Sequence, residues 1–129
     1  AVRARAIRAA HVAGVVLVIA FAAAGYRIAT DIHGYQIMSM PGAEERPSYG
    51  GQPSWRTKKR MFTWIRDDPE ALVVWVESEE DKLALVESEP AKFSTTPHYD
   101  GHPIVLVDLG AVDEQEAREL ITDSWRLRK

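Results

Sequence analysis

The feature that most constrains the fold is a run of strand-forming residues near the middle of the chain. Residues 71–77 read ALVVWVE, in which only the final glutamate is polar. Valine and tryptophan favour β-strands, and a short unbroken apolar run is typical of a strand that is covered on both faces. The sequence therefore predicts a sheet with this strand near its centre.

Two further segments supply neighbours for that strand. In residues 61–66, Met61, Thr63 and Ile65 alternate with Phe62, Trp64 and Arg66, which is the period of a strand. The turn sequence DDPE at residues 67–70 separates this segment from the central run, so the two are expected to form an antiparallel hairpin. Residues 104–109 (IVLVDL) follow a proline and predict another strand.

Three helices are expected around these strands. Ser78 can cap a helix over residues 79–87, with Leu83 and Val86 facing inward. Asp113 can cap the last helix, in which apolar positions recur at helical spacing. These positions are Ala117, Leu120, Ile121 and Trp125.

A first helix is predicted over residues 30–40. Thr30 can cap it, Asp31 suits its positive end, and Pro41-Gly42 would stop it. Gly34 weakens it, so it must be held by packing. Residues 43–53 read as a connector and residues 93–103 as a loop. The order helix, strands, helix, strand, helix predicts an α+β domain over residues 30–129, with an antiparallel sheet and its helices packed on one face in two layers.

Residues 1–29 differ in composition from the rest of the chain. They hold three early arginines, no acid, and a run at 12–25 without a polar side chain. The run is shorter than the roughly 20 residues of a membrane span. A signal-like leader, a poor membrane anchor and an extension without a role in the fold all remain open.

Charge and cysteine content narrow the functional classes. Four of the 16 Lys and Arg precede residue 30, so the rest of the chain carries 12 of them against 19 Asp and Glu, a formal charge of −7. Such a domain repels polyanions at long range, so any nucleic-acid site needs a local basic patch. The absence of cysteine excludes disulfides and thiolate metal sites, and it is compatible with the cytoplasm.

One segment offers such a patch. Residues 54–66 (SWRTKKRMFTWIR) hold five cations and no acid, with aromatic residues between them. Cations beside aromatic rings are suited to binding phosphates and stacking bases. The alternative is that the rings belong to the core and the cations to the solvated edge of a hairpin.

A second candidate is the loop TTPHYDGHP at residues 95–103. His98, Asp100 and His102 are metal-ligand types, and His98 with Asp100 could form a general base, but no fourth ligand and no nucleophile accompany them. A turn stiffened by two prolines explains the same residues. We therefore expect no metal, no cofactor and no catalytic residue.

With these segments laid out, the chain resembles the MmcQ/YjbR family. The resemblance rests on the ordered segments 41–45 (PGAEE), 46–50 (RPSYG), 53–56 (PSWR), 60–62 (RMF), 93–103 (FSTTPHYDGHP), 119–121 (ELI) and 124–126 (SWR). It implies a small α+β fold with a curved antiparallel sheet, described as double-winged. It also implies the family's usual label of a DNA-binding protein whose function is not established, and that label is itself an analogy from fold.

These observations favour a non-enzymatic, cytoplasmic binding domain. The resemblance makes DNA its nominal ligand, but the ligand itself is not established, and the charge of the domain argues against DNA. Any binding of DNA is expected to be weak and without sequence specificity. The candidate ligand-binding residues are Trp55, Arg56, Lys58, Lys59, Arg60 and Arg66, with His98, Tyr99 and His102 beside them. A protein-interaction or small-ligand module is the alternative, and a hydrolase built on His98 and Asp100 is a third reading. Export or membrane attachment applies only if residues 1–29 are a signal or an anchor.

Overall fold

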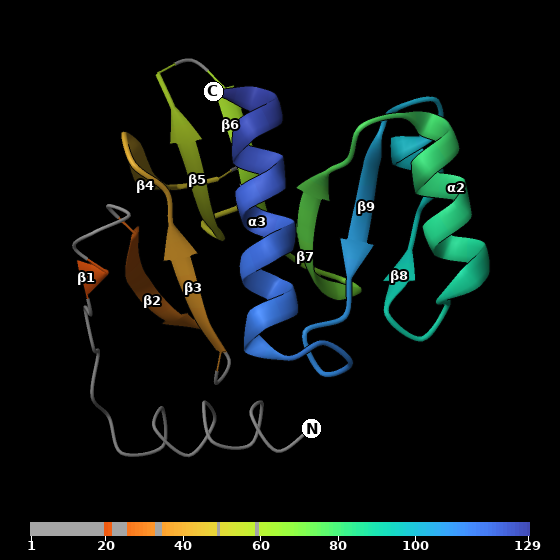
Figure 1. The fold of residues 1–129 in the computed structure, drawn as a ribbon, viewed down its shortest axis with the longest axis horizontal. Coiled ribbons are helices and arrows are strands. Elements are labelled where there is room, and N and C mark those ends of the chain that lie inside the picture. Colours follow the sequence, from red (N-terminus) through yellow and green to blue (C-terminus); the bar gives the residue numbers. More distant parts are fainter. Residues whose placement is uncertain (1–19, 22–25, 33–34, 49, 59) are drawn as a thin grey trace.

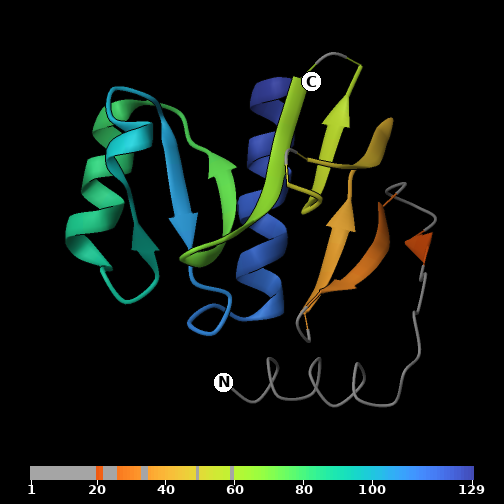
Figure 2. The ribbon, with the colours of Figure 1, turned by 180° about the vertical axis from the view of Figure 1, so that it is seen from behind.

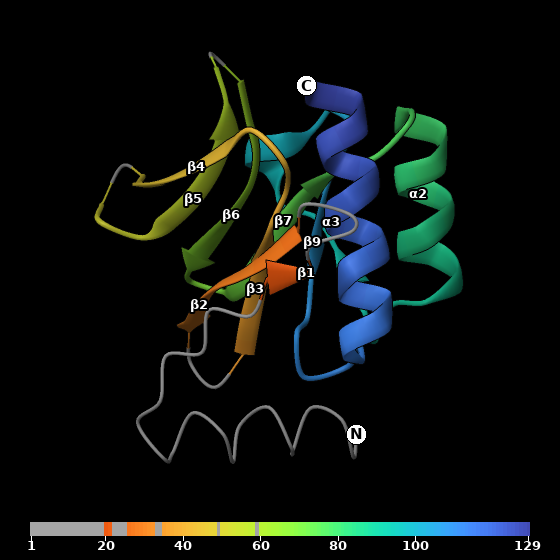
Figure 3. The ribbon, with the colours of Figure 1, turned by 60° about the vertical axis from the view of Figure 1, so that its left-hand side comes forward.

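The computed structural model describes residues 20–21, 26–32, 35–48, 50–58 and 60–129. Within them the strands form two antiparallel sheets, one in the order β1-β2-β3 and one in the order β4-β5-β6-β7-β9-β8 (Figure 1). Helices α2 and α3 lie together on one face of the larger sheet (Figure 3). The expected α+β class is therefore confirmed.

The elements of the described residues have the following bounds. The smaller sheet contains β1 (Ala20–Phe21), β2 (Tyr26–Ile32) and β3 (Tyr35–Ser39). The larger sheet contains β4 (Ala43–Pro47), β5 (Pro53–Thr57), β6 (Arg60–Asp67), β7 (Glu70–Trp75), β8 (Phe93–Ser94) and β9 (Ile104–Val107). The helices are α2 (Glu79–Ser88), the short 3-10 helix η1 (Pro97–Tyr99) and α3 (Glu114–Arg128).

Strand β7 lies inside the larger sheet, between β6 and β9, as the apolar run predicts. Leu72 and Val74 pack in the main core cluster, which also includes residues of α3. Val73 points to the other face of the sheet, where it packs in a second cluster with Tyr99 of η1. Figure 2 shows the ribbon from behind, with β6 in front of α3. The run is apolar on both faces of β7 because both of these faces are covered.

The predicted hairpin of β6 and β7 is confirmed, with Asp67 paired to Glu70 at its turn. On its other edge β6 pairs with β5, and there Trp55 opposes Thr63 while Arg56 opposes Met61. Phe62 is therefore the extra residue of a β-bulge, which turns its side chain into the main core. The bulge also decides to which face the cations of this hairpin point.

Helix α2 begins at the predicted cap, where the Asp81 backbone N–H donates to Ser78 Oγ at 3.1 Å. Its inward face differs from the prediction, because Leu83 is 54% exposed while Lys82 is buried. Lys82 Nζ donates to the backbone oxygens of Tyr99 at 2.6 Å and His102 at 2.9 Å. A buried ammonium needs such acceptors, and here it fixes the loop that carries η1.

Helix α3 is also capped as predicted, with the Glu116 N–H donating to Asp113 Oδ1 at 2.8 Å. Ile121 is fully buried and Trp125 partly so, in agreement with the expected apolar stripe. Ser124 is buried between them: its Oγ accepts from the Trp75 N–H at 2.8 Å and donates to the Phe62 oxygen. This hydroxyl attaches α3 to both strands of the central hairpin.

The predicted helix over residues 30–40 is wrong. The chain there forms β2 and β3, which pair antiparallel with Ile32 opposite Tyr35. Two physical effects favour strands: the β-branched and aromatic residues of the segment, and the cost of a glycine within a helix. Ile37, Met38 and Met40 are each at most 3% exposed, so tertiary packing holds this segment extended.

The predicted connector at residues 43–53 is also partly wrong, because β4 occupies its first half. Every residue of β4 pairs with a residue of β5, from Ala43 with Thr57 to Pro47 with Pro53. Its charged sequence AEERP suits an exposed edge strand, where charge and proline discourage pairing with another chain. Residues 1–29, for which a leader, an anchor and an extension all remain open, lie largely outside the described residues.

Candidate nucleic-acid interface

The candidate strip of residues 54–66 is divided by the sheet. Trp55 is fully buried in the core, so its ring is not part of any surface. Thr57 pairs with Arg60 and both line a cleft next to α3, whereas Arg56 pairs with Met61, which lines a pocket on the other face. Directly paired residues share a face, so the strip's cations do not form one continuous surface. Lys59 lies outside the described residues.

A cleft of about 590 Å³ lies between the tip of the β5–β6 hairpin and the end of α3. We call it the basic cleft. Its lining contains four cationic side chains and no acidic one. The lining residues are Pro41, Gly42, Thr57, Lys58, Arg60, Trp125, Arg128 and Lys129. Two of these cations come from the predicted strip and two come from the last residues of the chain.

Local backbone geometry places the two groups together. The hairpin reverses direction between Thr57 and Arg60, and Lys58 adopts a left-handed conformation with φ of 47°. On α3, Trp125, Arg128 and Lys129 recur at intervals of three and four residues, which puts them on one side of the helix. The turn and the helix end therefore present their cations to the same cleft.

Like charges within the basic cleft are not neutralised. Burial, followed by the nearby positive charge of Arg60, lowers the pKa of Arg128. The Arg128 guanidinium lies 3.9 Å from the centre of the Trp75 ring, and Lys129 Nζ lies 4.7 Å from that of Trp125. Among the described residues, no carboxylate lies within ion-pair distance of any of the four cations. An anion bound in the cleft would relieve this repulsion.

Arg128 and Lys129 line the basic cleft but are missing from the ligand-binding candidates that the sequence suggests. Their spacing from Trp125 was a usable signal for a shared face. The sequence does not show what lies opposite this face of α3. Nothing local in it indicates that the tip of the β5–β6 hairpin, at Lys58, lies beside the end of the helix.

The other candidate residues gather on the opposite face of the sheet. Arg66, His98 and Tyr99 line a pocket of about 480 Å³ together with Trp64. The His98 and Tyr99 rings are 4.9 Å apart in an edge-on arrangement, and Trp64 lies 6.3 Å from Tyr99. Arg66 Nη2 donates to the Asp68 backbone oxygen at 2.6 Å. His102 is exposed and does not line this pocket.

The candidate catalytic and metal-ligand side chains of the loop at residues 95–103 are open to solvent. His98, Asp100 and His102 are all exposed. Within the described residues no group of three or more His, Asp or Glu side chains is arranged to hold a metal. In that same part of the chain, no helix has the length and apolar character needed to cross a membrane.

Comparison with known proteins identifies one family model that matches most of the chain. The family model described as YjbR matches residues 38–127. Uncharacterized proteins of Mycobacterium bovis and Mycobacterium tuberculosis are 35% identical to this chain over 91 residues, which cover 57% of this chain and 70% of each relative. No solved structure gives a significant match. The matched segment contains the larger sheet, α2, α3 up to Leu127 and the hairpin side of the basic cleft.

Proposed function

Because the chain belongs to the YjbR family, we propose that it is a small non-enzymatic binding domain that holds the phosphate backbone of DNA weakly in the basic cleft. The matched relatives are uncharacterized, so the support comes from the site itself. The observation that carries the proposal is the convergence of four cations and no acid on one cleft. An anionic ligand is what such an unneutralised cluster favours.

The geometry suits a backbone rather than a base sequence. Lys58 at the hairpin tip and Lys129 at the helix end are both exposed, so they can reach phosphates on the outside of a duplex. Arg128 is held on the Trp75 ring, which keeps its orientation fixed. Contacts from cations to phosphates position a protein on DNA but carry no sequence information.

Binding is expected to be weak because two effects oppose it. The part of the chain after residue 29 has a formal charge of −7, so the domain as a whole repels DNA. The end of α3 is also the negative end of its helix dipole, which offsets part of the local positive charge. Four phosphate contacts correspond to a salt dependence with a slope of roughly −3 to −4 in a plot of log K against log salt concentration.

A small-ligand site is the second candidate. The pocket beside Arg66 combines a guanidinium, an imidazole and two other aromatic rings, and Lys82 holds the loop that supplies His98 and Tyr99. Such a set favours a planar anion over an extended polymer. Saturable binding of a mononucleotide that Arg66→Gln abolishes and Arg60→Gln leaves intact would support this candidate.

The test of DNA binding uses two double variants that remove equal charge. Arg60→Gln/Arg128→Gln empties the basic cleft of two cations, and Arg56→Gln/Arg66→Gln removes two cations that lie outside it. We expect the first variant to weaken binding of a labelled duplex about tenfold at about 50 mM salt, and the second to weaken it less than about threefold. Fluorescence anisotropy measures both, and circular dichroism verifies the fold.

Equal losses in the two variants would show that only the overall charge matters, and the basic cleft would then have no special role. The absence of any binding by the wild-type protein at low salt would contradict the proposal as a whole.

A further inference from the structure

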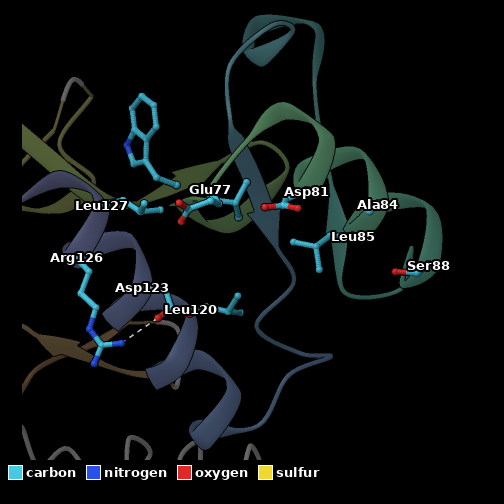
Figure 4. Close-up of a pocket in the computed structure, with 11 residues that line it drawn as sticks. Glu77, Asp81, Ala84, Leu85, Ser88, Leu120, Asp123, Arg126 and Leu127 are labelled. Carbon is cyan, nitrogen blue, oxygen red and sulfur yellow. Dashed lines mark hydrogen bonds and ion pairs between the residues drawn. The ribbon is translucent and has the colours of Figure 1, made fainter.

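A second concave surface lies between α2 and α3 and has the opposite character to the basic cleft. It is a groove of about 620 Å³ that opens on the helical face of the domain (Figure 4). Leu85 of α2 and Leu120 of α3 point toward one another across it. Its floor is therefore apolar, and its walls are two rigid helices.

One rim of the groove exposes apolar surface. Leu127 is 36% exposed and lines it, although α3 buries Ile121 fully on its inner side. Within the described residues, Leu83 is the one other large apolar side chain that is exposed, and it lies on α2 outside the groove. Half-buried leucines on both helices leave room for a further apolar side chain between them.

The charged residues of the groove are mainly acidic. Glu77 and Asp81 stand at its upper rim and form no ion pair among the described side chains. Asp123 is paired with Arg126 at 3.4 Å on the other wall, so the lining carries a net formal charge of −2. Free carboxylates beside an apolar floor are complementary to a cationic amphipathic segment.

We infer that the groove between α2 and α3 binds a cationic amphipathic helix of a partner protein. An apolar residue of that helix would enter between Leu85 and Leu120, and its Lys or Arg residues would lie against Glu77 and Asp81. The groove and the basic cleft use different residues of α3, which presents Trp125 and Arg128 to the cleft and Leu120 and Leu127 to the groove. They adjoin at Trp75, which lines the groove and carries the Arg128 guanidinium on its ring. The basic cleft repels a cationic helix, so such a helix is expected to bind in the groove rather than in the cleft.

The probe is a synthetic peptide of about 15 residues with leucines at helical spacing and lysines along their flanks. Its binding is followed by anisotropy and by amide chemical-shift changes in labelled protein. We expect the shifts to cluster on α2 and α3 around Leu85, Leu120 and Leu127. A peptide in which glutamate replaces each lysine is expected not to bind.

Two pairs of matched variants make the assignment specific. Leu127→Ala is expected to weaken peptide binding about fivefold, while Leu83→Ala, an exposed leucine outside the groove, is expected to leave it unchanged. Glu77→Gln/Asp81→Asn is expected to weaken it about tenfold, and Glu80→Gln/Glu87→Gln, which removes the same charge from α2 outside the lining, less than about twofold.

Equal losses in the two acidic pairs would overturn the inference, because attraction would then depend on overall charge. Shift changes that fall outside α2 and α3 would also overturn it. Sedimentation provides the remaining test: a dimer that Leu127→Ala dissociates would show that a second copy of the chain occupies the groove. DNA binding is measured on the same variants and is expected to remain as in wild type. A failure of the peptide experiment would therefore not bear on the basic cleft, which the DNA-binding experiment tests separately.

Discussion

The basic cleft and the α2–α3 groove share one helix yet differ in sign and in polarity. Trp125, Arg128 and Lys129 belong to the cleft, and Leu120, Asp123 and Leu127 belong to the groove. The cleft brings together four cations without an acid, whereas the groove sets unpaired carboxylates beside leucines. Residues that are neighbours in the sequence thus serve opposite surfaces, because the helical period separates them.

This difference shows why the net charge of the chain is a poor guide to its ligands. A formal charge of −3 argues against a nucleic-acid partner at long range. At contact distance the local charge determines which ligands bind, and α3 carries residues of a cationic surface and of an acidic surface. The predictions below break or sharpen this division, beginning with the largest expected effect.

The strongest perturbation should break both surfaces together. Ser124→Ala removes the hydroxyl that accepts from the Trp75 N–H and donates to the Phe62 oxygen, and it leaves two backbone groups without this partner. We expect a loss of about 1–3 kcal/mol in the free energy of unfolding. Weakened binding of both DNA and the cationic peptide should accompany it. Urea unfolding with Ser94→Ala as an exposed control provides the comparison.

A smaller change should separate stability from binding in the cleft. Lys58 is held at a φ of 47°, a conformation that costs a side-chain-bearing residue more than it costs glycine. Lys58→Gly should therefore raise the free energy of unfolding by about 0.5 kcal/mol while weakening DNA binding about threefold. Peptide binding should not change. A lower stability of the variant would contradict the strain that this conformation implies.

The smallest expected effect concerns repulsion within the cleft. Arg60 contributes to the lowered pKa of Arg128, so in the free protein these two cations oppose one another. Arg60→Gln should leave the free energy of unfolding unchanged or raise it by less than about 0.5 kcal/mol, and the melting temperature should follow it. Added salt should abolish that gain by screening the wild-type protein. A marked destabilisation would instead mean that Arg60 has a structural partner.

Local signals in the sequence predicted strands β6, β7 and β9 of the larger sheet and the helices α2 and α3. Ser78 and Asp113 are caps that act within a few residues, and the turn before Glu70 closes a hairpin between adjacent segments. Residues 30–40 were misassigned because their caps and stop signals are weak and long-range packing decides their conformation. Tertiary context also explains why Lys82 is buried while Leu83 is exposed. The backbone oxygens that accept from the Lys82 ammonium come from a loop that is distant in the sequence.

The candidate site was predicted in part. Lys58 and Arg60 do line the basic cleft, whereas Trp55 lies in the core and Arg66 faces a pocket on the other side of the sheet. Successive side chains of a strand point to opposite faces of a sheet, so the cations of the strip divide between two faces. The β-bulge at Phe62 and the approach of α3 determined which cations meet, and neither can be read from local sequence.

The most direct test of the basic cleft is the salt dependence of DNA binding by the wild-type protein and by Arg60→Gln/Arg128→Gln. Counterion release relates the slope of log K against log salt concentration to the number of phosphates that the protein neutralises. We predict a wild-type slope of roughly −3 to −4, which becomes less steep by about 2 in the variant. An identical slope in the two proteins would show that these arginines contact no phosphate, and it would contradict the assignment of the cleft as the DNA-binding surface.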